Sequence, residues 1–297
     1  MRVTQKILFG NFMRDINKNR VELGSVQSAL SSGKDVRVPS HDPTSFQRSR
    51  IIEENIRKEE QYQKNISSGL RQGRQAQEAL DETIDRLIDV KQILTQGAND
   101  SADAKVRGNM ADEIAGIRDS MVFTLNRSSG DRFLFAGTNS AEKPFEKEAA
   151  APGGVENNSN NTAPTVSVAD GVKLDLSVSG TELRDTEAGD LFEILGNIEQ
   201  ALRNDDREVL SGMIDDIDSG IEHVVTLNSR LGSNINRMEY IFEQYESARI
   251  YQKSDVSELV DADYAQSFSE LQRIQVAFES AMAVHSTMFN NSLLHYI

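Results

Sequence analysis

The residues of this sequence that could act in catalysis or in ligand binding do not occur in the combinations that such a site requires. Ser32-Gly33-Lys34 resembles the end of a phosphate-binding loop, but Asp35 follows where that loop needs Ser or Thr. Asp261-Ala262-Asp263 could open a calcium loop, yet Gln266 stands where its sharp turn needs Gly. The four His residues include no pair four apart, and the chain has no Cys. We therefore expect no catalytic, cofactor-binding or metal-binding residues, and no enzyme activity.

Heptad spacing of apolar residues marks both ends of the chain. Such spacing puts a narrow apolar stripe along a helix, as in the seam of a coiled coil, and the stripe needs a partner. We predict that the two end helices form an assembly interface. Its N-terminal residues are Phe9, Phe12, Ile16, Asn19, Leu23, Val26 and Leu30. Its C-terminal residues are Tyr264, Phe268, Leu271, Gln275, Phe278, Met282, His285 and Phe289.

Neither end helix carries enough apolar surface to fold alone. Burying one narrow stripe returns less free energy than is lost by ordering the backbone of the whole segment. We therefore expect both ends to be mobile in a lone subunit and ordered in an assembly.

Long helices are expected between the two ends. The first helix covers 1–31, and others cover about 45–96, 102–128 and 190–203, with one long helix running from Asp206 to a connecting stretch near 254–261. The long helix has the strongest seam, and its single central Asn would fix the register. This rod seam consists of Leu210, Ile214, Ile217, Ile221, Val224, Asn228, Leu231, Ile235, Met238, Phe242 and Tyr245.

The middle of the chain differs in character. The aromatic run 131–137 and the alternating segments 166–168 and 172–178 predict strands. Residues 149–164 are rich in Ala, Pro, Gly and Asn, which predicts an exposed loop. We expect a deletion of 150–165 to be tolerated.

The predicted fold class is mainly α: a long coiled-coil-like helical rod built from both termini, with a small β-rich insertion domain in the middle. Residues 1–40 would form an assembly helix that pairs with a second one at 256–297. Residues 41–130 plus 190–255 would form a long-helix rod domain, and 131–189 a β-rich outer domain.

Charge is distributed unevenly along the chain, whose net charge is −15. Residues 1–74 hold 14 Lys and Arg against 8 Asp and Glu, whereas the last 43 residues hold one against six. Such ends suit each other as coiled-coil neighbours. We expect no nucleic-acid binding, because basic and acidic residues alternate and the nearby aromatics lie on the seam. No apolar run reaches the length of a membrane span or a signal peptide, so we expect no membrane span and no cleaved signal.

Four blocks of sequence together resemble the flagellin superfamily. The first block is Met1-Arg2-Val3-Thr4-Gln5 with Ala29-Leu30-Ser31-Ser32-Gly33-Lys34 and His41-Asp42-Pro43, and the second is Arg132-Phe133-Leu134-Phe135-Ala136-Gly137-Thr138 with Pro144-Phe145. The third runs from Ser229-Arg230-Leu231-Gly232-Ser233 to Asn236-Arg237-Met238-Glu239. The fourth is Asp261-Ala262-Asp263-Tyr264-Ala265 with Ser292-Leu293-Leu294-His295-Tyr296-Ile297. Within the superfamily, the chain is similar to the hook-associated proteins of the hook–filament junction, the FlgL type.

The resemblance implies a structural subunit of the bacterial flagellum. It would join hook-associated protein to the flagellin filament by coiled-coil packing of its terminal helices, and it would be exported uncleaved to the extracellular flagellum by the type III apparatus. The implied partners are the first hook-associated protein, flagellin, copies of itself in a ring and an export chaperone.

Three alternatives remain at this point. Flagellin itself is the nearest, but Asp42-Pro43-Thr44-Ser45 stands where flagellins usually carry Asp-Asp-Ala-Ala-Gly. A cytoplasmic coiled-coil adaptor would stay inside the cell. An enzyme would need a polar pocket in the β-rich segment, for which the sequence offers no motif.

Overall fold

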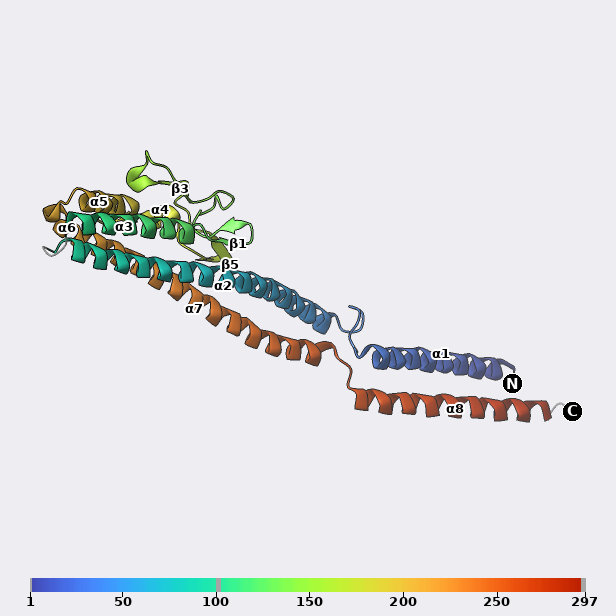
Figure 1. Cartoon of the computed structure of the whole chain (residues 1–297). Coiled ribbons are helices and arrows are strands. Elements are labelled where there is room, and N and C mark those ends of the chain that lie inside the picture. The colour runs from blue at the N-terminus through green and yellow to red at the C-terminus, as the bar shows by residue number, and fades with distance from the viewer. Residues whose placement is uncertain (1, 100–102, 295–297) are drawn as a thin grey trace. The chain divides into compact units, whose positions relative to one another are not determined.

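The computed structural model consists of long helices with short strands between them (Figure 1). It describes residues 2–99 and 103–294, and the side chains of these except 2–6, 8 and 287–294. The chain divides into two compact units. The terminal unit comprises Met1–Lys58 with Ala248–Ile297, and the central unit comprises Glu59–Ser247. The predicted mainly α fold class is confirmed, whereas the three-part domain division stays a proposal.

The terminal unit contains two helices that lie side by side, α1 (Arg2–Ser32) and α8 (Tyr264–Leu294). Helix α1 ends at Gly33, whose φ of 70° is a conformation that glycine adopts without strain. Helix α2 (Pro43–Gly97) begins after Asp42, whose carboxylate accepts hydrogen bonds from the backbone N–H groups of Thr44 (2.9 Å) and Ser45 (3.2 Å). Pro43 stands at the first position of this helix, where its missing N–H costs nothing.

The central unit is organised around α2 and α7 (Ile214–Val260), which run antiparallel. Ion pairs fix their register, since Lys91 contacts Asp218 and Arg74 contacts Glu239. Helices α3 (Ala104–Leu125) and α5 (Leu191–Arg203) pack against each other, also antiparallel, and α6 (Arg207–Gly212) precedes α7. One apolar core joins α2, α3, α5 and α7 with the strands.

Strands occur only as short antiparallel pairs in the described part of the chain. The pairs are β1 (Ser128–Ser129) with β2 (Arg132–Phe133), β3 (Phe145–Lys147) with β4 (Val155–Asn157), β5 (Thr165–Ala169) with β6 (Val172–Asp175), and β7 (Asp185–Thr186) with β8 (Gly189–Asp190). A 3-10 turn, η1 (Pro152–Gly154), and helix α4 (Gly180–Arg184) complete this region.

Two helix boundaries differ from the predictions. The expected connecting stretch at 254–261 is helical to Val260, because it contains neither Gly nor Pro to stop α7. The helix expected after Asp206 is divided into α6 and α7 at Gly212, whose flexible backbone lowers helix stability.

Two predictions for the β region are also corrected. The run 131–137 forms a strand only at Arg132–Phe133; its next three residues are buried in the core, and Gly137 turns the chain with a φ of 71°. The segment 149–164 is not a loop throughout, because β4 pairs with β3 there and Val155 is buried. Val155 is the one apolar residue of this strand, so the sequence shows no alternation of apolar and polar residues from which the strand could be predicted.

Candidate assembly interface

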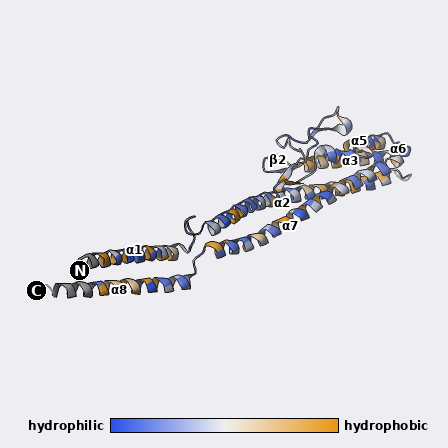
Figure 2. Cartoon of the chain, turned by 180° about the vertical axis from the view of Figure 1, so that it is seen from behind, coloured by the Kyte–Doolittle hydropathy of each residue, from blue (hydrophilic) through white to orange (hydrophobic). Residues whose placement is uncertain are grey.

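The two terminal helices pack through aromatic and aliphatic side chains. The ring of His285 on α8 stacks on Phe12 of α1 with a centroid distance of 4.1 Å, and Phe9 lies 5.9 Å from the same ring. Further along the pair, Ala29 on α1 and Ile274 on α8 are buried. Apolar residues therefore recur along both helices among hydrophilic ones (Figure 2).

The predicted seam residues of α1 lie on the side of the helix that contacts α8. Six of the seven are half-buried, and Phe9 remains 47% exposed. On α8, the half-buried members are Leu271, Phe278 and His285. The exposed members are Tyr264, Phe268, Gln275 and Met282, and the side chain of Phe289 lies outside the described residues.

The heptad pattern on α8 missed its most buried residue, Ile274, which is 3% exposed. The face toward α1 includes Leu271, Ile274, Phe278 and His285, whereas the heptad placed Gln275 on the seam. The covered residues Ser267, Leu271, Ile274, Phe278, Ala281 and His285 keep alternating steps of four and three, so the heptad spacing holds, and the predicted pattern placed every second seam position one residue too late. Ile274 stands next to Gln275 in the sequence, and its large apolar side chain was the signal that could have identified it as the seam residue.

Several large apolar side chains around α8 stay exposed after α1 has packed. Phe268, Val276, Met282 and Val284 are each at least half exposed, with Val276 at 62%. Such a concentration of large exposed apolar side chains is typical of a surface that contacts another protein. The contact between α1 and α8 therefore buries only part of the apolar surface of these helices.

The two chain segments that connect to α1 and α8 are joined to each other. Lys34 and Asp261 form an antiparallel β-bridge, and the N–H of Asp35 donates to the carbonyl of Val260 over 2.8 Å. The N–H of Ala262 donates to the carbonyl of Gly33 over 2.9 Å. The hydroxyl oxygen of Tyr264 lies 3.0 Å from the point where a Cβ on Gly33 would stand. These contacts hold the end of α1 next to the start of α8.

The predicted rod seam lies inside the central unit. Leu210, Ile217, Val224, Leu231, Ile235 and Met238 are buried, and Ile214, Ile221, Phe242 and Tyr245 are half-buried against the same core. Asn228 is half-buried, and its amide donates to the carboxylate of Asp81 over 2.6 Å. The pattern missed Leu227, which is 3% exposed.

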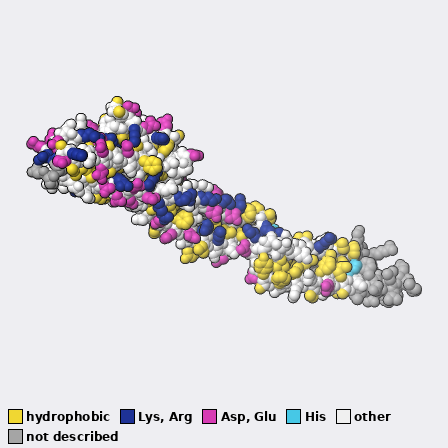
Figure 3. Space-filling view, in the orientation of Figure 1, with side chains coloured by type: hydrophobic (Ala, Val, Ile, Leu, Met, Phe, Trp, Pro, Cys, Tyr) yellow, Lys and Arg dark blue, Asp and Glu magenta, His cyan; other side chains and the backbone are white. Residues whose placement is uncertain are grey.

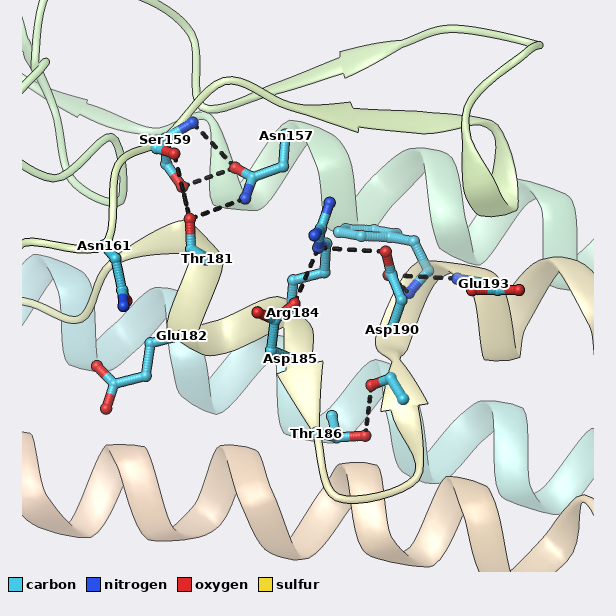
Figure 4. A network of polar contacts seen from close by, with 12 residues as sticks. Asn157, Ser159, Asn161, Thr181, Glu182, Arg184, Asp185, Thr186, Asp190 and Glu193 are labelled. Carbon is cyan, nitrogen blue, oxygen red and sulfur yellow. Dashed lines mark hydrogen bonds and ion pairs between the residues drawn. The ribbon is translucent and has the colours of Figure 1, made fainter.

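Polar contacts bind the β region to the helices. Asn157, Ser159 and Thr181 hydrogen-bond to one another, and Arg184 pairs with Asp190 at 3.2 Å (Figure 4). Burial raises the pKa of Asp190. Arg230 on α7 donates two hydrogen bonds to Glu182, of 2.7 and 2.8 Å, which hold the pKa of Glu182 below its ordinary value of 4.5. The lowered pKa of Glu182 therefore reflects a structural ion pair, and the raised pKa of Asp190 reflects its burial.

The described residues offer no metal site and no membrane-spanning helix. Among the described residues, no group of three or more His, Asp and Glu side chains could hold a metal ion. None of the helices in the same residues is long and apolar enough to cross a membrane.

Comparison with known proteins places these helices in a family. The family model "Bacterial flagellin N-terminal helical region" matches residues 3–140, and "Bacterial flagellin C-terminal helical region" matches residues 214–297. Flagellar hook-associated protein 3 of Escherichia coli K12 is 22% identical to the chain, and that of Salmonella typhimurium LT2 is 21% identical. Each alignment covers 99% of this chain and 98% of the relative.

Solved structures share the fold. A putative flagellar hook-associated protein from Vibrio parahaemolyticus superposes with a TM-score of 0.67 and 20% identity, over 74% of this chain and all of that one. The flagellar junction protein FlgL from Legionella pneumophila gives a TM-score of 0.61 and 12% identity, over 72% of this chain and all of that one. From these matches together, the chain belongs to the flagellin superfamily and, within it, to the FlgL-type hook-associated proteins.

Proposed function

We propose that this chain is a structural subunit of the bacterial flagellum that joins hook-associated protein to the flagellin filament. The observation that carries the proposal is the apolar surface on α8 that α1 leaves exposed. Its relatives of matching length are hook-associated proteins, and the flagellin family models match both of its ends. The subunit would use its terminal helices for packing against neighbours and would catalyse no reaction.

The proposed partners follow from the same surface. The half-buried seam residues of α1 and α8 hold the two helices together, and the exposed ones, Tyr264, Phe268 and Met282 among them, are free to contact other coiled-coil ends. The partners would be the first hook-associated protein on one side, flagellin on the other, and copies of the chain in a ring. An export chaperone would cover the exposed apolar residues of α8 before assembly, and the subunit would reach the extracellular flagellum without a cleaved signal.

The deciding experiment is deletion of the gene in its own host. We expect hooks to remain intact while unpolymerised flagellin accumulates in the medium, and we expect the wild-type gene to restore filaments. If the chain were flagellin, its loss would remove flagellin from the medium as well. If the chain were a cytoplasmic adaptor, it would be missing from sheared flagella of wild-type cells.

A further inference from the structure

The most exposed methionines, among those whose side chains the structure describes, lie on the two terminal helices. Met13 on α1 is 41% exposed, and Met282 on α8 is 50% exposed. The other methionines with described side chains belong to the central unit and are Met110, Met121, Met213 and Met238. All of these are buried or half-buried. The thioether groups that solvent reaches most easily therefore lie on the candidate assembly interface.

These two methionines lie on the same side of the terminal helix pair. The end of α1 bonds to the start of α8, so the two helices run antiparallel, and the ring of Phe12 stacks on that of His285. Counted toward the C-terminus, Met13 follows Phe12 by about 100° around α1. Met282 lies about 60° beyond His285 in the same sense of rotation around α8. In antiparallel helices, the same sense of rotation leads to the same side of the pair.

Phe9 extends the same surface. Its side chain is 47% exposed and lies between Phe12 and Met13 around α1. Hydrophobic side chains gather over the terminal helices in Figure 3. We refer to Phe9, Met13 and Met282 as the methionine face. Methionine suits a surface that meets more than one kind of partner, because its unbranched, polarizable side chain adapts to different neighbours.

The exposed sulfur atoms can react with a two-electron oxidant such as hydrogen peroxide. A lone pair of the sulfur attacks one peroxide oxygen, and the S–O bond forms as the O–O bond breaks. The hydroxide that leaves takes up a proton and becomes water, so the thioether is oxidised and the peroxide is reduced. The product is a sulfoxide, which turns a flexible apolar side chain into a polar one.

We propose that Met13 and Met282 are an oxidation site of the unassembled subunit, and that sulfoxide formation there keeps the subunit out of flagella. The effect on assembly rests on the proposed function, because it requires that neighbouring subunits cover the methionine face. A sulfoxide oxygen that is covered by apolar side chains loses its hydrogen bonds to water, which weakens the contact. Assembled subunits are protected, because the same neighbours keep the oxidant away from both sulfur atoms.

Peptide mass spectrometry tests the site after a short hydrogen peroxide treatment of purified monomer and of isolated flagella. In the monomer, we expect Met13 and Met282 to gain one oxygen about tenfold faster than the buried Met121 and Met238. In flagella, the rates at Met13 and Met282 should fall about tenfold as neighbours cover them. Fragment spectra distinguish Met282 from Met288, which share one tryptic peptide.

Substitutions measure the consequence for assembly. Glutamine is polar and similar in length to methionine sulfoxide, so Met13→Gln with Met282→Gln imitates the oxidised subunit. Leucine keeps the site apolar and cannot form a sulfoxide. We expect flagella to contain about tenfold less of the glutamine variant than of Met13→Leu with Met282→Leu. Ser280→Gln, at an exposed position on the other side of α8, is the control and should match wild type.

The remaining outcomes separate the two proposals. Equal oxidation rates at Met13 and Met238 in the monomer would overturn the oxidation site. Equal rates at Met13 and Met282 in monomer and in flagella would mean that neighbours leave this face open, which overturns the inference and leaves the junction function standing. The same holds if flagella contain equal amounts of the glutamine and leucine variants. Absence of the wild-type protein from flagella would overturn both proposals.

Discussion

At the scale of single residues, the stack of Phe12 on His285 joins the two terminal helices directly. We predict that Phe12→Asp abolishes incorporation into flagella, because a charge at this position separates α1 from α8. The thermal transition of the central unit, followed by circular dichroism, should not change. Asn17→Asp, an exposed position on the same helix, is the control and should swim normally. Normal swimming of the Phe12 variant would refute the role of the stack.

The ion pair between Glu182 and Arg230 predicts a pH dependence of stability. Because the folded-state pKa of Glu182 is lowered, its ionised form stabilises the fold above the ordinary pKa of 4.5, and this contribution is lost as the pH falls through the lowered value. Urea unfolding of wild type and Glu182→Gln should therefore differ at neutral pH, and the difference should shrink progressively as the pH falls below 4.5. If the two proteins differed by the same free energy of unfolding at neutral pH and well below pH 4.5, the stabilising role of ionised Glu182 would be contradicted.

At the scale of elements, the joint between the terminal helices and their connections depends on one glycine. Gly33→Ala should destabilise the joint by about 1 kcal/mol, because alanine is strained at a φ of 70° and its Cβ would crowd the Tyr264 hydroxyl. Hydrogen exchange of the Asp35 and Ala262 amides, which bond across the joint, measures the loss. Gly24→Ala is the matched control, since Gly24 lies inside α1 with open space around it and should gain stability. Unchanged exchange in the Gly33 variant would contradict this account.

The structure of segment 150–165 leads to a different expectation from the one drawn from its composition. An exposed loop should tolerate deletion. In the structure, however, this segment contains strand β4, whose Val155 is buried, and it also contains Asn160. The Asn160 carboxamide accepts a hydrogen bond from the Thr138 N–H over 3.0 Å. We therefore expect the deletion to lower the melting temperature of the central unit by several degrees, since it removes a strand and a buried side chain. A Gly171→Asn variant, in the β5–β6 turn with open space around it, should have a smaller effect.

At the scale of the whole molecule, periodicity and helix-stop residues predicted most of the fold. Expected helices at 45–96 and 190–203 match α2 and α5 to within two residues, because Pro43, Gly97 and the Asp190 cap fix their ends. The apolar seams located the core of α7 and the face of α1 toward α8. Periodicity did not identify Ile274, because the predicted pattern on α8 placed every second seam position one residue too late. It did not identify β4, because this strand has only three residues and a single buried one, Val155. Which apolar residues of α8 stay exposed is decided by the packing of α1, which no single segment encodes.

At the same scale, the two units differ in how completely their large apolar side chains are buried. Phe135, Phe145 and Phe192 are fully buried in the central unit, whereas Phe9 and Phe268 in the terminal helices are about half exposed. The terminal pair therefore lacks a core that could offset the entropy of ordering two long helices. Chymotrypsin should trim α1 and α8 first in dilute monomer and leave a fragment close to Glu59–Ser247. The same ends should resist the protease in intact flagella, where neighbours cover them. Equal resistance of both units in the monomer would mean that the terminal helices are stable alone, and that their exposed apolar surface is not an unfinished interface.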